Sequence, residues 1–106
     1  MKVSIAADRG HEPRRREPRV PIAAEVPLRE LGRNSVPAKL VNLSSRGFMA
    51  ETAALISPGA RVWLSLPGLS RVNALVVWAR NGHVGGEFSQ VVDPLAVFHA
   101  AGTSAR

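Results

Sequence analysis

The chain of 106 residues carries a formal net charge of +6, is 45% hydrophobic and contains no cysteine. This length suits one small domain with a single core, and the missing cysteine excludes disulfides and thiolate zinc sites. Twelve of the fourteen basic residues are arginine, and residues 1–19 carry half of the net charge. Such a segment favours an anionic partner, because guanidinium groups bind phosphates in a bidentate manner.

The N-terminal region divides into a tail and an arm. Residues 1–12 show little apolar periodicity, so we expect a flexible tail there. Residues 13–22 hold three prolines and four arginines: Pro13, Arg14, Arg15, Arg16, Pro18, Arg19 and Pro21. Proline fixes φ and favours an extended conformation in the residue before it. We therefore predict a mobile, extended arm that leads into the fold.

From residue 23 onward, short β-rich stretches alternate with turn signals. Strands are predicted over residues 23–30, 36–43, 48–51, 61–66, 71–80 and 83–88. Asn81-Gly82 is the strongest hairpin signal, because this pair readily adopts positive φ angles. Asp93-Pro94 is typical of a helix start and predicts a short helix that ends at His99 or Ala100.

These elements predict an all-β domain, a small six-stranded antiparallel β-barrel whose closure leaves no exposed strand edge. The domain is expected to span residues 13–100 and to include the arm. Residues 101–106 are expected to form a C-terminal tail.

Arg15 and Arg19 are four positions apart, so in an extended chain their side chains point to the same side, roughly 13 Å apart. Each guanidinium can donate paired hydrogen bonds to a guanine edge or a phosphate and can stack on a purine. The alternative is a solvated arm or a non-specific nucleic-acid contact, which is common among arginine-rich termini.

A second polar cluster covers residues 42–47. Asn42 and Ser44 lie two positions apart at a predicted strand end, so in extended geometry both side chains face the same way. Gly47 supplies a positive φ or a close backbone approach where a side chain would obstruct a ligand. The alternative is an Asx-type or Ser-type turn that only closes a hairpin.

Together the two clusters resemble the PilZ domain family, bacterial receptors for cyclic di-GMP. That family is marked by Arg-x-x-x-Arg and, later in the chain, Asp/Asn-x-Ser-x-x-Gly. Residues 15–19 and 42–47 fit the two motifs in the right order. The resemblance extends over about residues 13–93 and includes a late hairpin that ends in Gly-x-x-Phe at residues 85–88.

The resemblance implies a cyclic di-GMP site made of Arg14, Arg15, Arg19, Asn42, Ser44, Gly47 and Trp78. Arg15 and Arg19 would hold guanine edges and phosphates. Asn42 and Ser44 would contact a guanine from the barrel surface, and Gly47 would keep the turn open.

Two of these residues have a less defined role. Arg14 is an added basic residue, which in similar proteins helps to hold a second, stacked ligand molecule. Trp78 stands where some members place an aromatic ring against a guanine, and a position in the core is the alternative.

The predicted function is that of a non-enzymatic receptor whose arm closes over cyclic di-GMP and alters a surface for a downstream protein partner. We expect no catalytic group, metal or cofactor. The sequence shows no nucleophile with an evident general base, no metal-ligand spacing and no phosphate-binding loop. No stretch is long enough for a membrane helix, so we expect a cytoplasmic protein without a membrane partner.

Two alternatives and one open point remain. The first alternative is a small basic barrel that binds RNA or single-stranded DNA. Long nucleic acid is disfavoured, because the chain has five aromatic residues and most are expected in the core. The second alternative is an interaction module that needs no ligand. The oligomeric state is left open.

Overall fold

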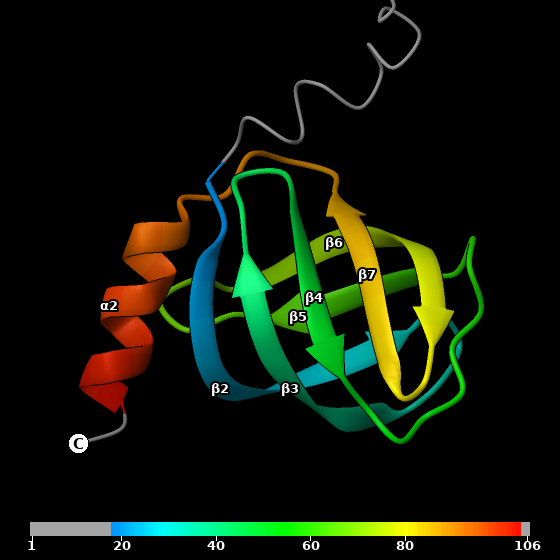
Figure 1. Cartoon of the computed structure of the whole chain (residues 1–106). Coiled ribbons are helices and arrows are strands. Elements are labelled where there is room, and N and C mark those ends of the chain that lie inside the picture. The colour runs from blue at the N-terminus through cyan, green and yellow to red at the C-terminus, as the bar shows by residue number, and fades with distance from the viewer. Residues whose placement is uncertain (1–17, 105–106) are drawn as a thin grey trace, which may run out of the picture.

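The computed structural model describes residues 18–104, in which six strands form a closed barrel followed by one helix. The strands are β2 (Val20–Glu30), β3 (Ser35–Leu43), β4 (Gly47–Glu51), β5 (Arg61–Ser65), β6 (Arg71–Arg80) and β7 (His83–Phe88), and the helix is α2 (Pro94–Ser104). The order around the barrel is β2-β3-β4-β7-β6-β5, with all neighbours antiparallel. In Figure 1, β3, β4 and β7 face the viewer, β5 and β6 lie behind, and α2 lies beside β2.

The predicted antiparallel barrel with a short C-terminal helix is thereby confirmed. The expected tail over residues 1–12 and the first half of the predicted arm, residues 13–17, lie outside the described residues.

The barrel interior is filled by aliphatic side chains that alternate along the strands. Leu28, Leu40 and Leu64 are each 0–1% exposed, and burying one such side chain stabilises the fold by about 1.5–3 kcal/mol. Phe48 is the largest fully buried side chain, and its ring stacks on that of Phe88 with 5.7 Å between centroids. Phe88, at the end of β7, therefore packs against the core.

The β6–β7 hairpin closes as its sequence predicts. Asn81 and Gly82 both have positive φ, 52° and 77°, as the two central residues of a type I′ turn require. This turn brings the end of β6 back along β7 and pairs Trp78 with Gly85.

Strand β2 begins at Val20, three residues earlier than predicted. Val20 pairs with Leu43 of β3 and Pro21 with Asn42, and the register then shifts before Ala24. This bulge accommodates Pro21, because proline cannot donate a ladder hydrogen bond and is confined to strand edges, strand starts and bulges. The last part of the predicted arm is therefore already a barrel strand.

Helix α2 starts as predicted but ends later. The Oδ1 atom of Asp93 accepts the backbone N–H groups of Leu95 and Ala96 over 3.1 and 3.4 Å, as an N-cap does. Residues 101–104 continue the helix instead of forming a tail, and Ala101 packs against the core. Within residues 18–104 no helix is both long and apolar enough to cross a membrane.

Candidate functional site

Arg19 and Asn42, one from each sequence motif, meet where β2 begins and β3 ends. The Nη1 atom of Arg19 donates a 2.7 Å hydrogen bond to the Oδ1 atom of Asn42, although the two residues are 23 positions apart in the sequence. The pairing of Pro21 with Asn42 explains the contact, because it carries the residues before Pro21 to the edge of β3. The structure thus brings part of the arginine motif onto the second motif.

Asn42 faces the outside of the barrel because β3 is irregular just before it. Leu40 and Leu43 are both buried in the core, and the register against β4 shifts between Leu40 and Asn42. The extra residue, Val41, breaks the alternation of inward and outward side chains. Asn42 therefore points outward, where its side chain is half-buried.

Trp78 is placed outside the barrel in the same way. Val76 is buried, and the register of β6 against β7 shifts between Val76 and Trp78. The indole lies over Gly85, where an added Cβ would overlap its Nε1 and Cε2 atoms. The guanidinium carbon of Arg80 lies 5.5 Å from the ring centroid. The hydrophobic core, as residues 18–104 define it, does not include Trp78.

Asn42 and Trp78 lie in one row across the outer face of the barrel. The register pairs Asn42 with Met49, Met49 with Gly85, and Gly85 with Trp78. The Nδ2 atom of Asn42 donates to the Sδ atom of Met49 over 3.7 Å. Three strand spacings separate the row's ends, a span of about 14 Å. A polar amide, a thioether and an indole thus share this face, which we call the Asn42–Trp78 row.

Sequence reasoning missed two members of this row, Met49 and Gly85. Met49 is half-buried between the buried Phe48 and Ala50, so its outward position follows from the alternation of β4. Gly85 is one of two adjacent glycines, which is the signal for a close approach of another group.

Ser44 and Gly47 build the β3–β4 turn. Ser44 is 4% exposed, and its Oγ atom accepts the N–H groups of Arg46 and Gly47 over 3.2 and 3.1 Å. The hydroxyl of Ser44 therefore points into the turn, whereas the amide of Asn42 lies on the outer face. Extended geometry predicts that the two polar groups face the same way. They do not, because β3 ends at Leu43 and Ser44 already belongs to the turn.

Gly47 is needed for close packing of two strands. Its φ lies outside the left-handed region, so the turn does not require glycine for that reason. A Cβ on Gly47 would overlap the carbonyl oxygen of Gly86 in β7. Of the two expected roles, the structure shows a close backbone approach, to β7.

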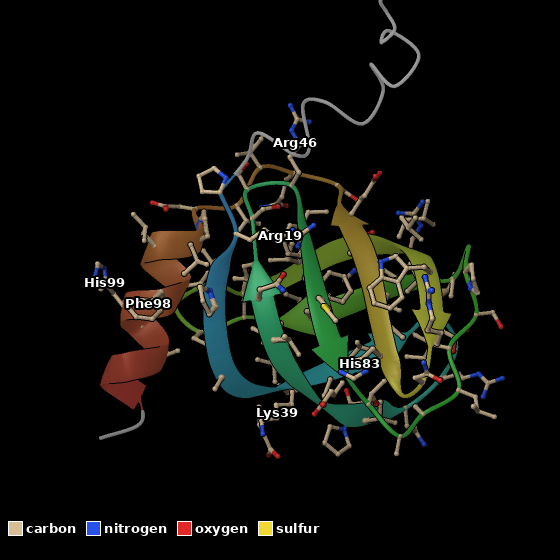
Figure 2. The ribbon with its side chains drawn as sticks, in the orientation of Figure 1. Arg19, Lys39, Arg46, His83, Phe98 and His99 are labelled. Carbon is tan, nitrogen blue, oxygen red and sulfur yellow. The ribbon has the colours of Figure 1, made fainter. Side chains whose placement is uncertain are left out.

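Two arginines lie toward the end of the barrel that carries the turn. Figure 2 shows Arg19 and Arg46 toward this end and Lys39 and His83 toward the other. Arg19 and Arg46 are both exposed, so an anionic ligand at this end of the barrel can reach their guanidinium groups. Arg14 and Arg15 lie outside the described residues. No cluster of three or more acidic or histidine side chains within residues 18–104 is arranged to hold a metal ion.

Comparison with known proteins agrees with this fold. The sequence model of the PilZ domain family matches residues 13–96. The Bacillus subtilis inhibitor of motility (MotI/DgrA) has a similar solved structure, with a TM-score of 0.57 and 17% identity over 87% of this chain. The chain spans about half of that protein, 51% of its length. A search of curated protein sequences finds no significant match.

Arg19 of the first motif and the turn of the second motif lie at one end of a closed six-stranded barrel. The family match assigns this barrel to a class of ligand-binding modules that are generally not catalysts. With the family match covering most of its length, the chain belongs to the PilZ domain family, a family of cyclic di-GMP receptors.

Proposed function

We propose that the chain is a non-enzymatic receptor for cyclic di-GMP. The hydrogen bond between Arg19 and Asn42 carries the proposal, because it joins the last arginine of one family motif to the first residue of the other. Family membership supplies the ligand class. A divided motif that closes into one surface is what a compact ligand with two guanines and two phosphates requires.

The Asn42–Trp78 row suits a guanine nucleotide. A guanidinium has five N–H donors, so Arg19 can keep its bond to Asn42 and still donate to a guanine edge or a phosphate. The amide of Asn42 can pair with a polar edge of the base. Trp78 and Met49 supply apolar surface on the same face. Ser44 and Gly47 act on the ligand indirectly, by fixing the turn that carries Arg46.

Arg14 and Arg15 would act as part of the arm. In this proposal the arm closes over the ligand, so that their guanidinium groups contact its phosphates and guanines. Ordering the arm costs conformational entropy, which these contacts must exceed. The receptor would signal in the cytoplasm through the difference between an open and a closed arm, which a downstream protein partner detects.

Titration calorimetry with cyclic di-GMP tests the proposal. Arg19→Ala and Asn42→Ala should each weaken binding about tenfold or more, because hydrogen bonds to charged groups contribute about 1.5–3 kcal/mol. Lys39→Ala is the matched control, since it removes one cation at the other end of the barrel. It should change the affinity by less than about twofold. Absence of measurable heat at tens of micromolar ligand would contradict the proposal.

A single-stranded RNA oligonucleotide distinguishes the main alternative. Binding of RNA that weakens steeply with salt and is insensitive to Asn42→Ala, without binding of cyclic di-GMP, would favour the basic-barrel alternative. Competition of unlabelled cyclic di-GMP against a fluorescent analogue at constant salt separates the two outcomes.

A further inference from the structure

A second cluster of ordered side chains lies on the outer face of β2, β5 and β6. The register pairs Arg29 with Trp63 and Trp63 with Asn73, so these residues form a row across three strands. The guanidinium carbon of Arg29 lies 5.1 Å from the centroid of the Trp63 ring. Together with Arg61 these residues form what we call the Trp63 surface. Strands β5 and β6 form the back of the barrel in Figure 1, whereas β3 and β4 face the viewer.

Two guanidinium groups of this surface are held in place by neutral partners. Arg29 is stacked on Trp63, and the Nη1 atom of Arg61 donates a 2.7 Å hydrogen bond to the Oδ1 atom of Asn73. The same Oδ1 atom accepts the hydroxyl of Ser89 over 3.1 Å. Among the described side chains, neither arginine forms an ion pair with a carboxylate. Both therefore keep their charge and most of their donors for a partner.

Exposed leucines flank Arg61 on both sides, one just after the end of β2 and one on β6. The backbone N–H of Leu31 bonds to the carbonyl oxygen of Arg61, and Leu75 is the register partner of Arg61 on β6. Leu31 is 62% exposed and Leu75 39%. The surface thus alternates cationic and apolar groups over a few strand positions.

This mixture favours a protein partner over a nucleic acid. Arg29 already occupies a face of the Trp63 ring that a stacked base would need. A nucleic-acid backbone gains nothing from the two leucines, whereas an amphipathic protein segment covers them. Tryptophan and arginine are also the residue types most enriched among those that dominate protein–protein binding energy.

We propose that the Trp63 surface binds a protein segment that presents carboxylates beside an apolar side chain. Arg29 and Arg61 each take one carboxylate in a bidentate contact, and Leu31 and Leu75 cover the apolar side chain. Because both guanidinium groups are already restrained, binding loses less side-chain entropy than it would with mobile arginines. The surface is separate from the Asn42–Trp78 row and does not depend on cyclic di-GMP.

The test uses NMR of the full chain titrated with a synthetic peptide of alternating glutamate and leucine. The two tryptophans give an internal comparison, because each has one indole N–H signal and each is stacked by an arginine. We expect the Trp63 signal and the β5 amides to shift, with the Trp78 signal unchanged. A peptide with lysine in place of glutamate should shift neither.

Matched variants separate a defined site from general charge attraction. The double variant Arg29→Gln with Arg61→Gln should weaken peptide binding about tenfold or more. Arg80→Gln removes one positive charge, that of the guanidinium over the other tryptophan, and should change the affinity for the peptide by less than about twofold. Arg61→Lys keeps the charge but loses the planar fork, and it should weaken binding even if the double variant does not fold.

Four outcomes would overturn the proposal. Equal shifts of both tryptophans, or equal weakening by Arg80→Gln, would show non-specific attraction. Binding of oligouridine at Trp63 without binding of the acidic peptide would identify a nucleic acid as the occupant. An unchanged affinity of Arg61→Lys for the peptide would show that the paired donors of Arg61 are not needed for binding. Failure of cyclic di-GMP to bind in calorimetry would leave all of these results unaffected.

Discussion

The indole ring of Trp78 fills the space that a side chain at Gly85 would need. A Cβ built on Gly85 would overlap two ring atoms and lie 2.7 Å from a third, Cζ2. The next residue, Gly86, leaves room for a ring inside the barrel in the same way, because a Cβ built on it would lie 2.7 Å from Cε1 of Phe48. The glycine pair therefore seats one aromatic ring outside the barrel and one inside.

Gly85→Ala should displace Trp78 and destabilise the fold by about 1–3 kcal/mol, the range for an extra methyl group in a tightly packed place. Urea denaturation followed by tryptophan fluorescence measures the free energy of unfolding, and the native emission should also shift. Because Trp78 belongs to the proposed ligand site, the affinity for cyclic di-GMP should fall as well.

The control for this substitution is the same change in a Trp78→Ala background. Without the indole, the alanine at residue 85 meets no ring, so its effect should fall below about 1 kcal/mol. An equal effect in both backgrounds would show that the conflict lies with another group.

Ser44→Ala should destabilise the chain by about 1–3 kcal/mol, the penalty for leaving a buried donor without an acceptor. The buried N–H of Gly47 loses the Oγ atom that it bonds over 3.1 Å. Thermal unfolding measures the loss, and faster hydrogen exchange of the Gly47 amide locates it.

Ser45→Ala is the matched control for the turn. The carbonyl group of Ser45 accepts the N–H of Val92, and this backbone bond survives the substitution. Ser45→Ala should therefore change the free energy of unfolding by no more than about 0.5 kcal/mol. Equal losses for the two serine variants would mean that the Ser44 hydroxyl has no special role in the turn.

The strand pattern could be predicted because its signals are local. Asn81-Gly82 specifies its own turn, and the alternation along β5 is visible without knowledge of its neighbours. The bulges beside Asn42 and Trp78 could not be predicted, because they appear only when a strand is paired with its partner. Strict alternation would place both residues inside the barrel.

The candidate site was predicted in part, through two motifs that resemble a known family. Met49 and Gly85 were missed because neither carries distinctive chemistry, and their row forms only when β4 pairs with β7. Most aromatic residues were expected in the core. Trp63 and Trp78 instead lie outside, each with an arginine over its ring, since the interior is filled by smaller aliphatic side chains.

Gly47→Ala should destabilise the barrel by about 1–3 kcal/mol or more, because the clash is with backbone and β4 must move away from β7. Chemical denaturation measures the effect. Gly102→Ala is the contrasting variant, since no atom beyond its chain neighbours and its own helix backbone lies within 4 Å of its Cβ position. In the helix it should stabilise the chain by about 0.5–1 kcal/mol. Destabilisation by both alanines would point to a general intolerance of substitution.

Asn42→Asp tests whether the amide of Asn42 acts through its oxygen or its nitrogen. The carboxylate keeps the acceptor for Arg19 and turns the 2.7 Å contact into an ion pair. Because the contact is exposed, it should add at most about 1 kcal/mol of stability and lose this gain in high salt. The carboxylate also loses the donor that contacts Met49. Calorimetry should show cyclic di-GMP binding retained, since the family motif allows either residue. A folded Asn42→Asp chain that no longer binds would instead assign the Nδ2 donor to the ligand.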